Sequence, residues 1–459
     1  MLANVGVETT TRLLLPDVAE ALRSSPASVL ELTDELHAAD LAELATELEV
    51  DLAMILLATL PVEPAARLVG ALEKTKRLEL FGLLVEKSQA RAVELAEVMA
   101  PDERADLFGE LPEDVRTSLL AKLTREEQRD VRQLLAYPDG TAGSIMTTAF
   151  IAVAAEQTVR QAIEQVRVSA EEMETIYAAY AVDPNGVLVG VVSLRDLVVA
   201  KGEKTILETM EPNVISLEAE ADKGEAARLI AKYDLLALPV TDRTHRLVGI
   251  ITVDDVVDLI QEEAGDDVQK LGGVAPLEGA YFETGFWEFV RKRLMWLVVL
   301  FLGELLTGNA MHHYTATFEN VAALIWFVPL IISSGGNAGS QSASLMIRAL
   351  AVGEVKPSDF AKVLVRELSI GLSLGLALAL VGALRVLLWP ATRTMVFVGT
   401  VSLSIVGVVT AGTVIGSALP LLLRRLGLDP AVSSTPFIAS LVDVIGLVLY
   451  FEIARAFLF

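Results

Sequence analysis

The stretch VPLIISSGGNAGSQSASLMIRALAVGEV, residues 328–355, decides the fold of the second half of the chain. It begins and ends like an apolar membrane span, but glycines and polar side chains interrupt its middle. In hydrocarbon, backbone that leaves the helix is tolerated only where it is buried in protein or lines a wet cavity. The stretch therefore predicts a broken span inside a membrane protein. The interrupting residues are Gly335, Gly336, Asn337, Ser340 and Gln341.

The interruption can serve either of two purposes. Asn337, Ser340 and Gln341 lie near helical spacing, so their polar atoms gather on one face. Such a face can line a hydrophilic path, or it can join two helices by hydrogen bonds. Because hydrogen bonding between helices does not require Gly335 and Gly336, the pair favours a path. All five interrupting residues are therefore candidates for lining it.

Five stretches of this half are long and apolar enough to cross about 30 Å of hydrocarbon. Basic residues cluster at the start of the first stretch, as Arg291, Lys292 and Arg293, and around the loop after the second. The positive-inside rule then places the N-terminus in the cytoplasm and the C-terminus outside. The sequence predicts a multi-pass protein of the cell membrane, embedded in the lipid bilayer. The predicted spans are Phe286–Asn309, 321–352, Val363–Leu388, Met395–Leu423 and Val432–Phe459.

Asp443, in the fifth span, is the most informative single residue. A carboxylate near the middle of a span costs about 2.5–3.5 kcal/mol on insertion scales, so it should face a polar interior. One explanation is a structural salt bridge to an intramembrane arginine such as Arg385. An ion path is favoured, because small residues beside Asp443 leave room for a hydrated ion. The neighbours predicted to line that path are Pro436, Ala439, Ser440 and Gly446.

Charge separates the two halves of the chain. Residues 286–459 carry 12 basic and 9 acidic side chains. The whole chain has a net charge of −24, so residues 1–285 carry −27. An acidic soluble half repels phosphate, which argues against nucleic acid and makes divalent cations the expected partners.

Missing residues exclude several kinds of chemistry. The chain has no cysteine, which removes disulfides, thiolate catalysis and zinc–cysteine sites. Its histidines never form His-Glu-x-x-His, and no Gly-x-x-x-x-Gly-Lys loop is present. An intramembrane metalloprotease and a P-loop pump are therefore excluded, and no enzyme is predicted.

The acidic half predicts two folds. From Pro16 to Leu135, apolar residues recur at helical spacing between proline-led turns, which predicts an all-α domain. An ordinary helical domain and a stack of helical repeats explain that pattern equally well. From residue 138 the pattern becomes strand, helix, strand, strand, helix, and this order then recurs. Two copies of one α/β module are predicted, since three pairs of residues are 59 apart: Gly190 and Gly249, Ser193 and Thr252, Asp196 and Asp255.

Both copies end in Gly-x-x-Ser/Thr-x-x-Asp, as GVVSLRD and GIITVDD. This ending resembles that of CBS domains, a regulatory module that often binds adenine nucleotides. The resemblance implies that Ser193, Asp196, Thr252 and Asp255 face a ribose and phosphates, so ATP is a possible ligand. A cap at the start of a helix explains the hydroxyls of Ser193 and Thr252 equally well.

Acidic residues crowd the helix that leaves the second module. Asp255, Asp258, Glu262, Glu263, Asp266 and Asp267 repel one another at this spacing. A solvated acidic face is the common explanation of such a run. The alternative is a divalent cation held by carboxylates and water, which suits Mg²⁺. Asp102, Glu103 and Asp106 form a smaller acidic patch at the start of a helix, which stabilisation of a helix dipole also explains.

The order of these parts resembles the MgtE family of magnesium channels and transporters over nearly the whole chain. The motifs that carry the resemblance are YPDGTAGSIMT (137–147), KYDLLALPV (232–240), RLVGIITVDDVVD (246–258), QKLGGV (269–274), GGNAGSQSASLMIRALAVGEV (335–355) and PFIASLVDVIGLVLYF (436–451). The resemblance implies a homodimer with a Mg²⁺-selective pore between subunits, closed by Mg²⁺ bound to the cytoplasmic domains. Gly140 and Gly224 stand where the family often has acids.

Family positions transfer onto this chain residue by residue. Asp443 matches the carboxylate that holds hydrated Mg²⁺ in the pore. The regulatory metal positions match Asp255, Asp258, Glu263, Asp266 and Asp267 in the second module and the connecting helix, Asp234 in KYD, and Asp102 and Asp106 in the helical domain.

The sequence therefore predicts a multi-domain α-helical membrane protein. Its expected parts are an acidic helical domain (1–137), two α/β CBS domains (138–202 and 203–262), a connecting helix (263–284) and five spans (285–459). The predicted function is Mg²⁺ uptake down its electrochemical gradient. The alternatives are transport of another divalent cation, Mn²⁺ or Co²⁺, and a membrane-anchored sensor without transport.

Overall fold

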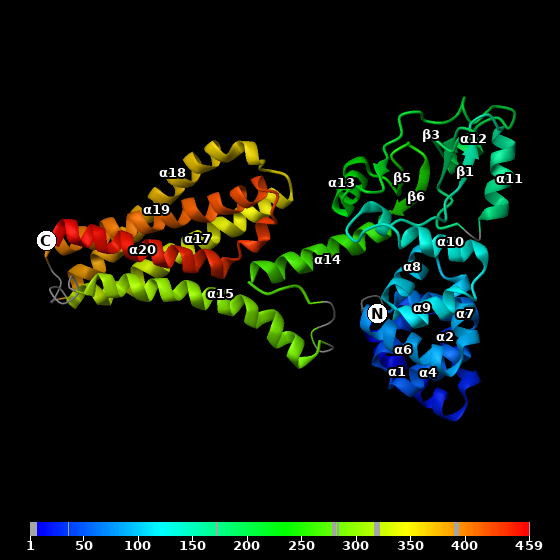
Figure 1. Ribbon diagram of the computed structural model, residues 1–459, viewed down its shortest axis with the longest axis horizontal. Coiled ribbons are helices and arrows are strands. Elements are labelled where there is room, and N and C mark those ends of the chain that lie inside the picture. Colours follow the sequence, from blue (N-terminus) through cyan, green and yellow to red (C-terminus); the bar gives the residue numbers. More distant parts are fainter. Residues whose placement is uncertain are drawn as a thin grey trace, which may run out of the picture. The chain divides into compact units, whose positions relative to one another are not determined.

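The computed structural model describes residues 7–34, 36–170, 173–277, 281, 284–315, 322–389 and 394–458. Val321 and Phe459, which bound two of the predicted spans, lie outside the described residues. The chain divides into two compact units, Met1–Gln261 and Glu262–Phe459. Figure 1 labels their helices and strands.

The first part of unit 1 is built from short helices around a common apolar core (Figure 1). Polar caps set several of their starts. Thr124 and Glu127, for example, form a reciprocal capping box at the start of α10. Pro16, where the predicted array begins, lies inside α1. The helices are α1 (Val7–Ser24), α2 (Val29–Thr33), α3 (Ala38–Glu47), α4 (Val50–Thr59), α5 (Val62–Ala71), α6 (Lys74–Lys87), α7 (Gln89–Val98), α8 (Pro101–Glu110), α9 (Glu113–Leu120) and α10 (Arg125–Leu134).

Two small α/β modules follow, and they confirm the predicted repeat. In each, a parallel strand pair is extended by an antiparallel third strand, in the order β1-β2-β3 and β4-β5-β6. The elements are β1 (Ala152–Ala154), α11 (Val159–Ser169), β2 (Ala178–Val182), β3 (Leu188–Ser193), α12 (Leu194–Val199), β4 (Leu217–Glu218), α13 (Lys223–Tyr233), β5 (Ala237–Thr241), β6 (Leu247–Thr252) and α14 (Val253–Leu271).

The register of the sheets repeats as closely as the sequence does. Ala181 pairs with Gly190 in the first module, and Val240 pairs with Gly249 in the second. Both pairs stand directly before a β-bulge. The offset of 59 residues is therefore an offset between equivalent positions in space.

α14 runs without a break past residue 262, and it ends earlier than the predicted connecting helix. Its last residue is Leu271, whereas the prediction extended the helix to residue 284. Gly273 explains the stop, because its φ of +71° belongs to the left-handed region that glycine adopts most readily. The Val274 amide then donates to the Gln269 carbonyl.

Unit 2 contains five helices that are long and apolar enough to cross a membrane among the described residues, which confirms the predicted number of spans. α17, α18, α19 and α20 form a bundle, and α15 lies alongside α20 (Figure 1). The helices are α15 (Phe286–His313), α17 (Val328–Ala351), α18 (Phe360–Leu388), α19 (Met395–Arg425) and α20 (Thr435–Leu458).

The predicted break in the second span is wrong. α17 is a continuous helix from Val328 to Ala351, through both glycines. Close contact with α19 explains why glycine is needed there. A Cβ on Gly416 would lie 2.1 Å from the carbonyl oxygen of Gly339, and one on Gly412 would lie 2.4 Å from that of Gly335. The two backbones therefore touch, as small residues allow within membranes.

Gly335 also serves packing, contrary to the sequence argument that helix association does not need the glycine pair. A Cβ on Gly335 would lie 2.4 Å from Val408 Cγ1. Gly446 on α20 approaches the same Val408 side chain, at 2.9 Å from Cγ1. Val408 thus fills the space that two glycines leave between α17, α19 and α20.

Candidate functional site

Asp443 lies in the middle of α20 and faces α17 at a glycine. A Cβ on Gly336 would lie 3.3 Å from Asp443 Oδ1 and 3.7 Å from the Cβ of Ala439. Any larger residue at position 336 would therefore crowd the carboxylate. The glycine thus allows α17 to approach a carboxylate closely at membrane depth.

No basic side chain among the described residues forms an ion pair with Asp443. Arg385, the suggested salt-bridge partner, places its guanidinium 4.2 Å from the centre of the Trp389 ring instead. Arg455, on α20 itself, pairs with Glu452 at 2.8 Å. A carboxylate without a protein cation is the group that a permeating cation can use.

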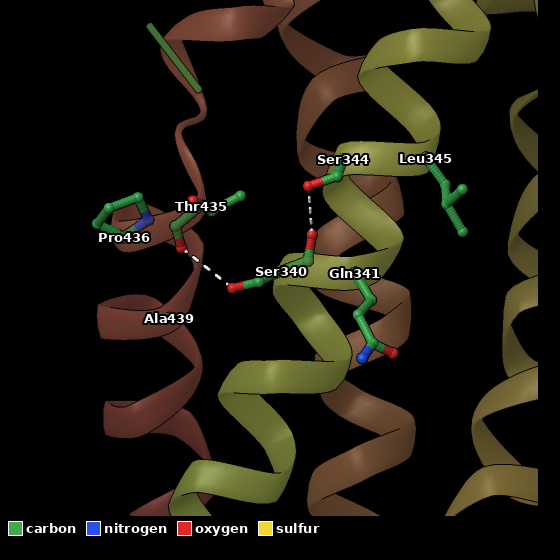
Figure 2. Close-up of a pocket in the computed structure, with 7 residues that line it drawn as sticks. All are labelled: Ser340, Gln341, Ser344, Leu345, Thr435, Pro436 and Ala439. Carbon is green, nitrogen blue, oxygen red and sulfur yellow. Dashed lines mark hydrogen bonds between the residues drawn. The ribbon is translucent and has the colours of Figure 1, made fainter. Parts of the chain in front are cut away.

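A hollow of about 750 Å³ opens between α17 and α20 (Figure 2). The Ser340 hydroxyl donates to the Thr435 carbonyl at 3.2 Å, and the Ser344 hydroxyl donates to the Ser340 carbonyl at 3.0 Å. Gln341 extends away from Thr435 in Figure 2. The lining residues are Ser340, Gln341, Ser344, Leu345, Thr435, Pro436 and Ala439.

The other residues predicted to line the path occupy different surroundings. Asn337 is exposed, and its Nδ2 donates to Ser333 Oγ at 3.4 Å. The Ser440 hydroxyl donates to Glu304 Oε1 at 3.1 Å. Gly335 and Gly446 are buried against Val408, so they serve helix packing.

Two intramembrane carboxylates were missed by the sequence reasoning. Glu304 on α15 contacts Ser440, one helical turn from Asp443. Glu367 on α18 accepts a hydrogen bond from the Ser342 hydroxyl at 2.8 Å. The signal was present in both cases, since a lone acid within an apolar span is as unusual as Asp443.

An acidic cluster forms within unit 1, between α8 and the start of α14. It brings the predicted residues Asp102, Asp106 and Asp255 together with three others, and the members are Asp102, Glu103, Asp106, Glu174, Asp254 and Asp255.

Burial is the main cause of the unusual acidities in this cluster, and repulsion between the carboxylates adds to it. Burial raises the pKa of Asp102, and it raises the pKa values of Asp106 and Asp255 to about 6. The pKa values of Glu103 and Glu174 are raised to about 7. Desolvated carboxylates that repel one another are sites where a cation is favoured.

The cluster suits a cation that keeps part of its water shell. Asp102 Oδ1 is buried and has no hydrogen-bond partner among the described residues. Within the same described ranges, no three acidic or histidine side chains come close enough to enclose a bare ion. Mg²⁺ retains several waters and binds through one or two carboxylates, so these donors fit it.

The acidic residues of α14 divide into two groups. Asp258 and Glu263 are exposed, whereas Asp266 and Asp267 are half-buried near the end of the helix. Lys270 Nζ lies 3.1 Å from Asp429 Oδ2, in the segment just before α20. Burial raises the pKa of Asp267, and the charge of Asp429 adds to the effect. This end of α14 is therefore a second place where carboxylates crowd.

Asp234 lies apart from both acidic groups. It is exposed at the C-terminus of α13, with a φ of +51°. Aspartate is one of the few residues that enter the left-handed region with little strain, so this backbone position alone explains its presence.

The residues proposed to face a nucleotide bond to each other in both modules. Ser193 Oγ caps α12, because it accepts from the Asp196 amide at 3.1 Å, and it donates to Asp196 Oδ2 at 2.5 Å. In the second module, Thr252 Oγ1 donates to Asp255 Oδ2 at 2.5 Å, and the same oxygen accepts from the Thr252 amide at 3.4 Å. A nucleotide would have to share these hydroxyls.

Comparison with protein families follows the same division into parts. Residues 36–140 match the MgtE intracellular N domain, residues 142–203 and 204–262 match CBS domains, and residues 328–453 match a family described as a divalent cation transporter. The fold and these matches define the class: a multi-pass membrane protein of the divalent cation transporters that carries a CBS pair.

Full-length relatives narrow that class. The chain is 37% identical to the magnesium transporter MgtE of Thermus thermophilus over 97% of this chain and 98% of the relative. It is 31% identical to the magnesium transporter MgtE of Bacillus subtilis over 93% of each. The chain belongs to the MgtE family of magnesium transporters.

Solved structures resemble the first unit. One is described as the soluble part of a magnesium transporter, with 33% identity, a TM-score of 0.52, and coverage of 55% of this chain and 99% of that one. Another is the cytosolic domain of the Mg²⁺ channel MgtE in complex with ATP, with 35% identity, a TM-score of 0.51, and coverage of 54% and 100%.

Proposed function

We propose that this protein carries hydrated Mg²⁺ across a cell membrane, down its electrochemical gradient. The observation that carries the proposal is Asp443, a carboxylate at membrane depth with no basic partner among the described residues and with Gly336 in front of it. Relatives named as magnesium transporters support the choice of ion. The membrane potential contributes about 2.3 kcal/mol per charge per 100 mV, and twice that for a divalent ion.

The hollow, whose lining includes Ala439 one helical turn before Asp443, is large enough for an ion with its water shell. Pro436 and Ala439 lie on the same face of α20 as Asp443, and both line the hollow. Serine hydroxyls and carbonyl oxygens of α17 and α20 also border it. The water ligands of a hydrated ion could hydrogen-bond to one of these oxygens after another, so that the ion keeps its inner shell as it moves.

We also propose that internal Mg²⁺ closes the path. Without the ion, the carboxylates of Asp102, Asp106 and Asp255 repel one another. Bound Mg²⁺ would neutralise that repulsion, and the same holds for Asp266 and Asp267 at the end of α14. Binding biases the equilibrium only if the closed state has the higher affinity.

The remaining features of the proposal follow from the family. The protein is a homodimer with its path between subunits, its N-terminus is cytoplasmic, and its C-terminus is outside. ATP binds the CBS pair, a proposal supported by the solved cytosolic domain of the Mg²⁺ channel MgtE, which is described as a complex with ATP. Nucleotide and metal would then compete for, or share, Asp255.

Flux into proteoliposomes tests the transport proposal. Asp443→Ala should abolish Mg²⁺ uptake, whereas Asp359→Asn, a control at a half-buried acid in the turn before α18 that pairs with Lys362, should transport like the parent. Normal uptake by folded Asp443→Ala would exclude the path described here. Replacing Mg²⁺ with Mn²⁺ or Co²⁺ measures the alternative cargo, and the absence of any cation flux in the parent would favour a membrane-anchored sensor.

The gating proposal needs a separate measurement. Flux is followed while Mg²⁺ on the internal side is raised. The parent should close, and the double variant Asp255→Asn with Asp258→Asn should stay open. Closure of the variant at the parent's Mg²⁺ concentration would remove these residues from regulation.

A further inference from the structure

Glu304 faces the edge of α20 that carries Asp443. Contacts between α15 and α20 run in register from Trp296 to Tyr314 on one side and from Ser434 to Glu452 on the other. Trp296 Nε1 donates to Ser434 Oγ at 3.0 Å near one end, and the Tyr314 hydroxyl donates to Glu452 Oε1 at 2.7 Å near the other. The Ser440–Glu304 hydrogen bond, at 3.1 Å, lies between them.

The depth of Glu304 follows from this register. Ser440 precedes Asp443 by three residues on one helix face, which is about 4.5 Å along the axis. Glu304 therefore lies within about one turn of Asp443 in depth, and the charges of the two carboxylates interact. Both are far from either end of their helices.

Glu304 has no basic partner among the described residues. The lysine and arginine residues of α15 are confined to its first turns, where Lys292 pairs with Glu288 at 3.2 Å, and its two histidines, His312 and His313, lie in its last turn. A hydroxyl is the group that orients the Glu304 carboxylate, and a hydroxyl cannot neutralise its charge. An unneutralised carboxylate at this depth is expected to contact water or a cation.

We infer that Glu304 is a second carboxylate of the ion path, which holds the hydrated cation together with Asp443. This inference rests on the proposed transport function. The two carboxylates accept hydrogen bonds from different water ligands of one ion, and the Ser440 hydroxyl fixes the orientation of Glu304. Two negative charges about one turn apart favour a divalent ion over a monovalent one. Glu304 is thus a residue that sets affinity for the permeating ion.

The test compares variants in proteoliposomes over a range of external Mg²⁺. Glu304→Gln keeps the size of the side chain and its hydrogen-bond acceptor but removes the charge. It should raise the half-saturating Mg²⁺ concentration by about three- to tenfold. It should weaken block by hexaamminecobalt(III), an exchange-inert mimic of hydrated Mg²⁺, by a similar factor. Glu304→Asp should retain both parent values more closely.

Two further variants separate an effect of the Glu304 charge from a general disturbance of helix packing. Glu288→Gln, at an acid of the same helix that pairs with Lys292, should match the parent. Ser440→Ala should change the affinity for Mg²⁺ in the same direction as Glu304→Gln, but by a smaller factor. Because Ser440→Ala keeps the Glu304 charge, it still tests the inference if Glu304→Gln does not fold.

The outcomes are distinct. If Asp443→Ala abolishes flux while Glu304→Gln and Ser440→Ala keep the parent's half-saturation and block, Glu304 only joins two helices and the inference is wrong. If Asp443→Ala transports normally, the proposed function itself has failed.

Discussion

Lys270 Nζ lies 3.1 Å from Asp429 Oδ2, and this ion pair joins the end of α14 to the segment before α20. The same ammonium lowers the pKa of Asp267, which burial and Asp429 raise. One lysine therefore offsets the repulsion of several carboxylates. A divalent cation would neutralise the same carboxylates, so Lys270 and the cation compete for them.

Removal of that lysine should make the end of α14 depend on Mg²⁺. In Lys270→Met, amide exchange of residues 262–271 in Mg²⁺-free buffer should be about two- to fivefold faster than in the parent, since half-exposed ion pairs contribute little. Added Mg²⁺ should slow it again. Lys362→Met, which removes the ion pair of a more exposed lysine with Asp359, should leave this segment unchanged. Equal exchange in Lys270→Met and the parent would contradict the role given to the pair.

The contact between α17 and α19 predicts a strong effect of a single methyl group. Gly416→Ala would place its Cβ 2.1 Å from the Gly339 carbonyl oxygen, so the helices must separate, at a cost of about 1–3 kcal/mol. Gly399→Ala, on the same helix with nothing within 4 Å, should be neutral or slightly stabilising. Thermal unfolding in detergent measures both, and equal unfolding temperatures would refute the contact.

The stability of unit 1 should fall as the pH rises through the raised pKa values of the acidic cluster. The pKa values of Glu103 and Glu174, about 7, and of Asp106 and Asp255, about 6, exceed the ordinary values of 4.5 and 3.8. The folded unit therefore holds protons that the unfolded chain releases, and its unfolding free energy decreases from about pH 4 to about pH 7.

Calorimetry in the presence of EDTA measures that slope, with about 2–4 °C expected for each kcal/mol. Excess Mg²⁺ should reduce the slope, because the ion replaces the protons. Asp102→Asn should also reduce it, whereas Asp51→Asn, at an exposed acid of α4, should not. A stability that rises over this pH range would show that the carboxylates are already neutralised within the protein.

The caps of the two modules provide a test for nucleotide binding. Thr252→Ala removes the hydroxyl that donates to Asp255, which should cost about 1 kcal/mol without ATP. If ATP also contacts this hydroxyl, the rise in unfolding temperature on adding ATP should be smaller than in the parent. Ser193→Ala is the matched change in the first module. If ATP raises the unfolding temperature of Thr252→Ala as much as that of the parent, the Thr252 hydroxyl serves only the hydrogen bond to Asp255.

Local patterns were sufficient to predict most of the fold. Five apolar stretches and the offset of 59 residues follow from composition and spacing, and the structure confirms both. Helix continuity through Gly335 and Gly336 did not follow, because it depends on Val408 and on α19, which are distant in sequence. Glycine breaks an isolated helix readily, but packing against another backbone offsets that tendency.

The candidate site, like the fold, could be predicted only in part from the sequence. Asp443 stands out in sequence because an acid in an apolar span is rare. Its neighbours Gly336 and Glu304 come from other helices, so only the three-dimensional arrangement shows that they face it. The same holds for Glu174, which joins Asp102 and Asp255 from a loop far along the chain.

The backbone contact between Gly339 and Gly416 holds α17 firmly against α19, whereas α15 has no buried residue in its described length. A Cβ on Gly303 would lie 4.0 Å from the Cβ of Ser440, a separation that a disulfide can bridge. Since the chain contains no cysteine, Gly303→Cys with Ser440→Cys would form a single disulfide between α15 and α20. If flux requires α15 to move relative to α20, oxidation should stop the flux and reductant should restore it.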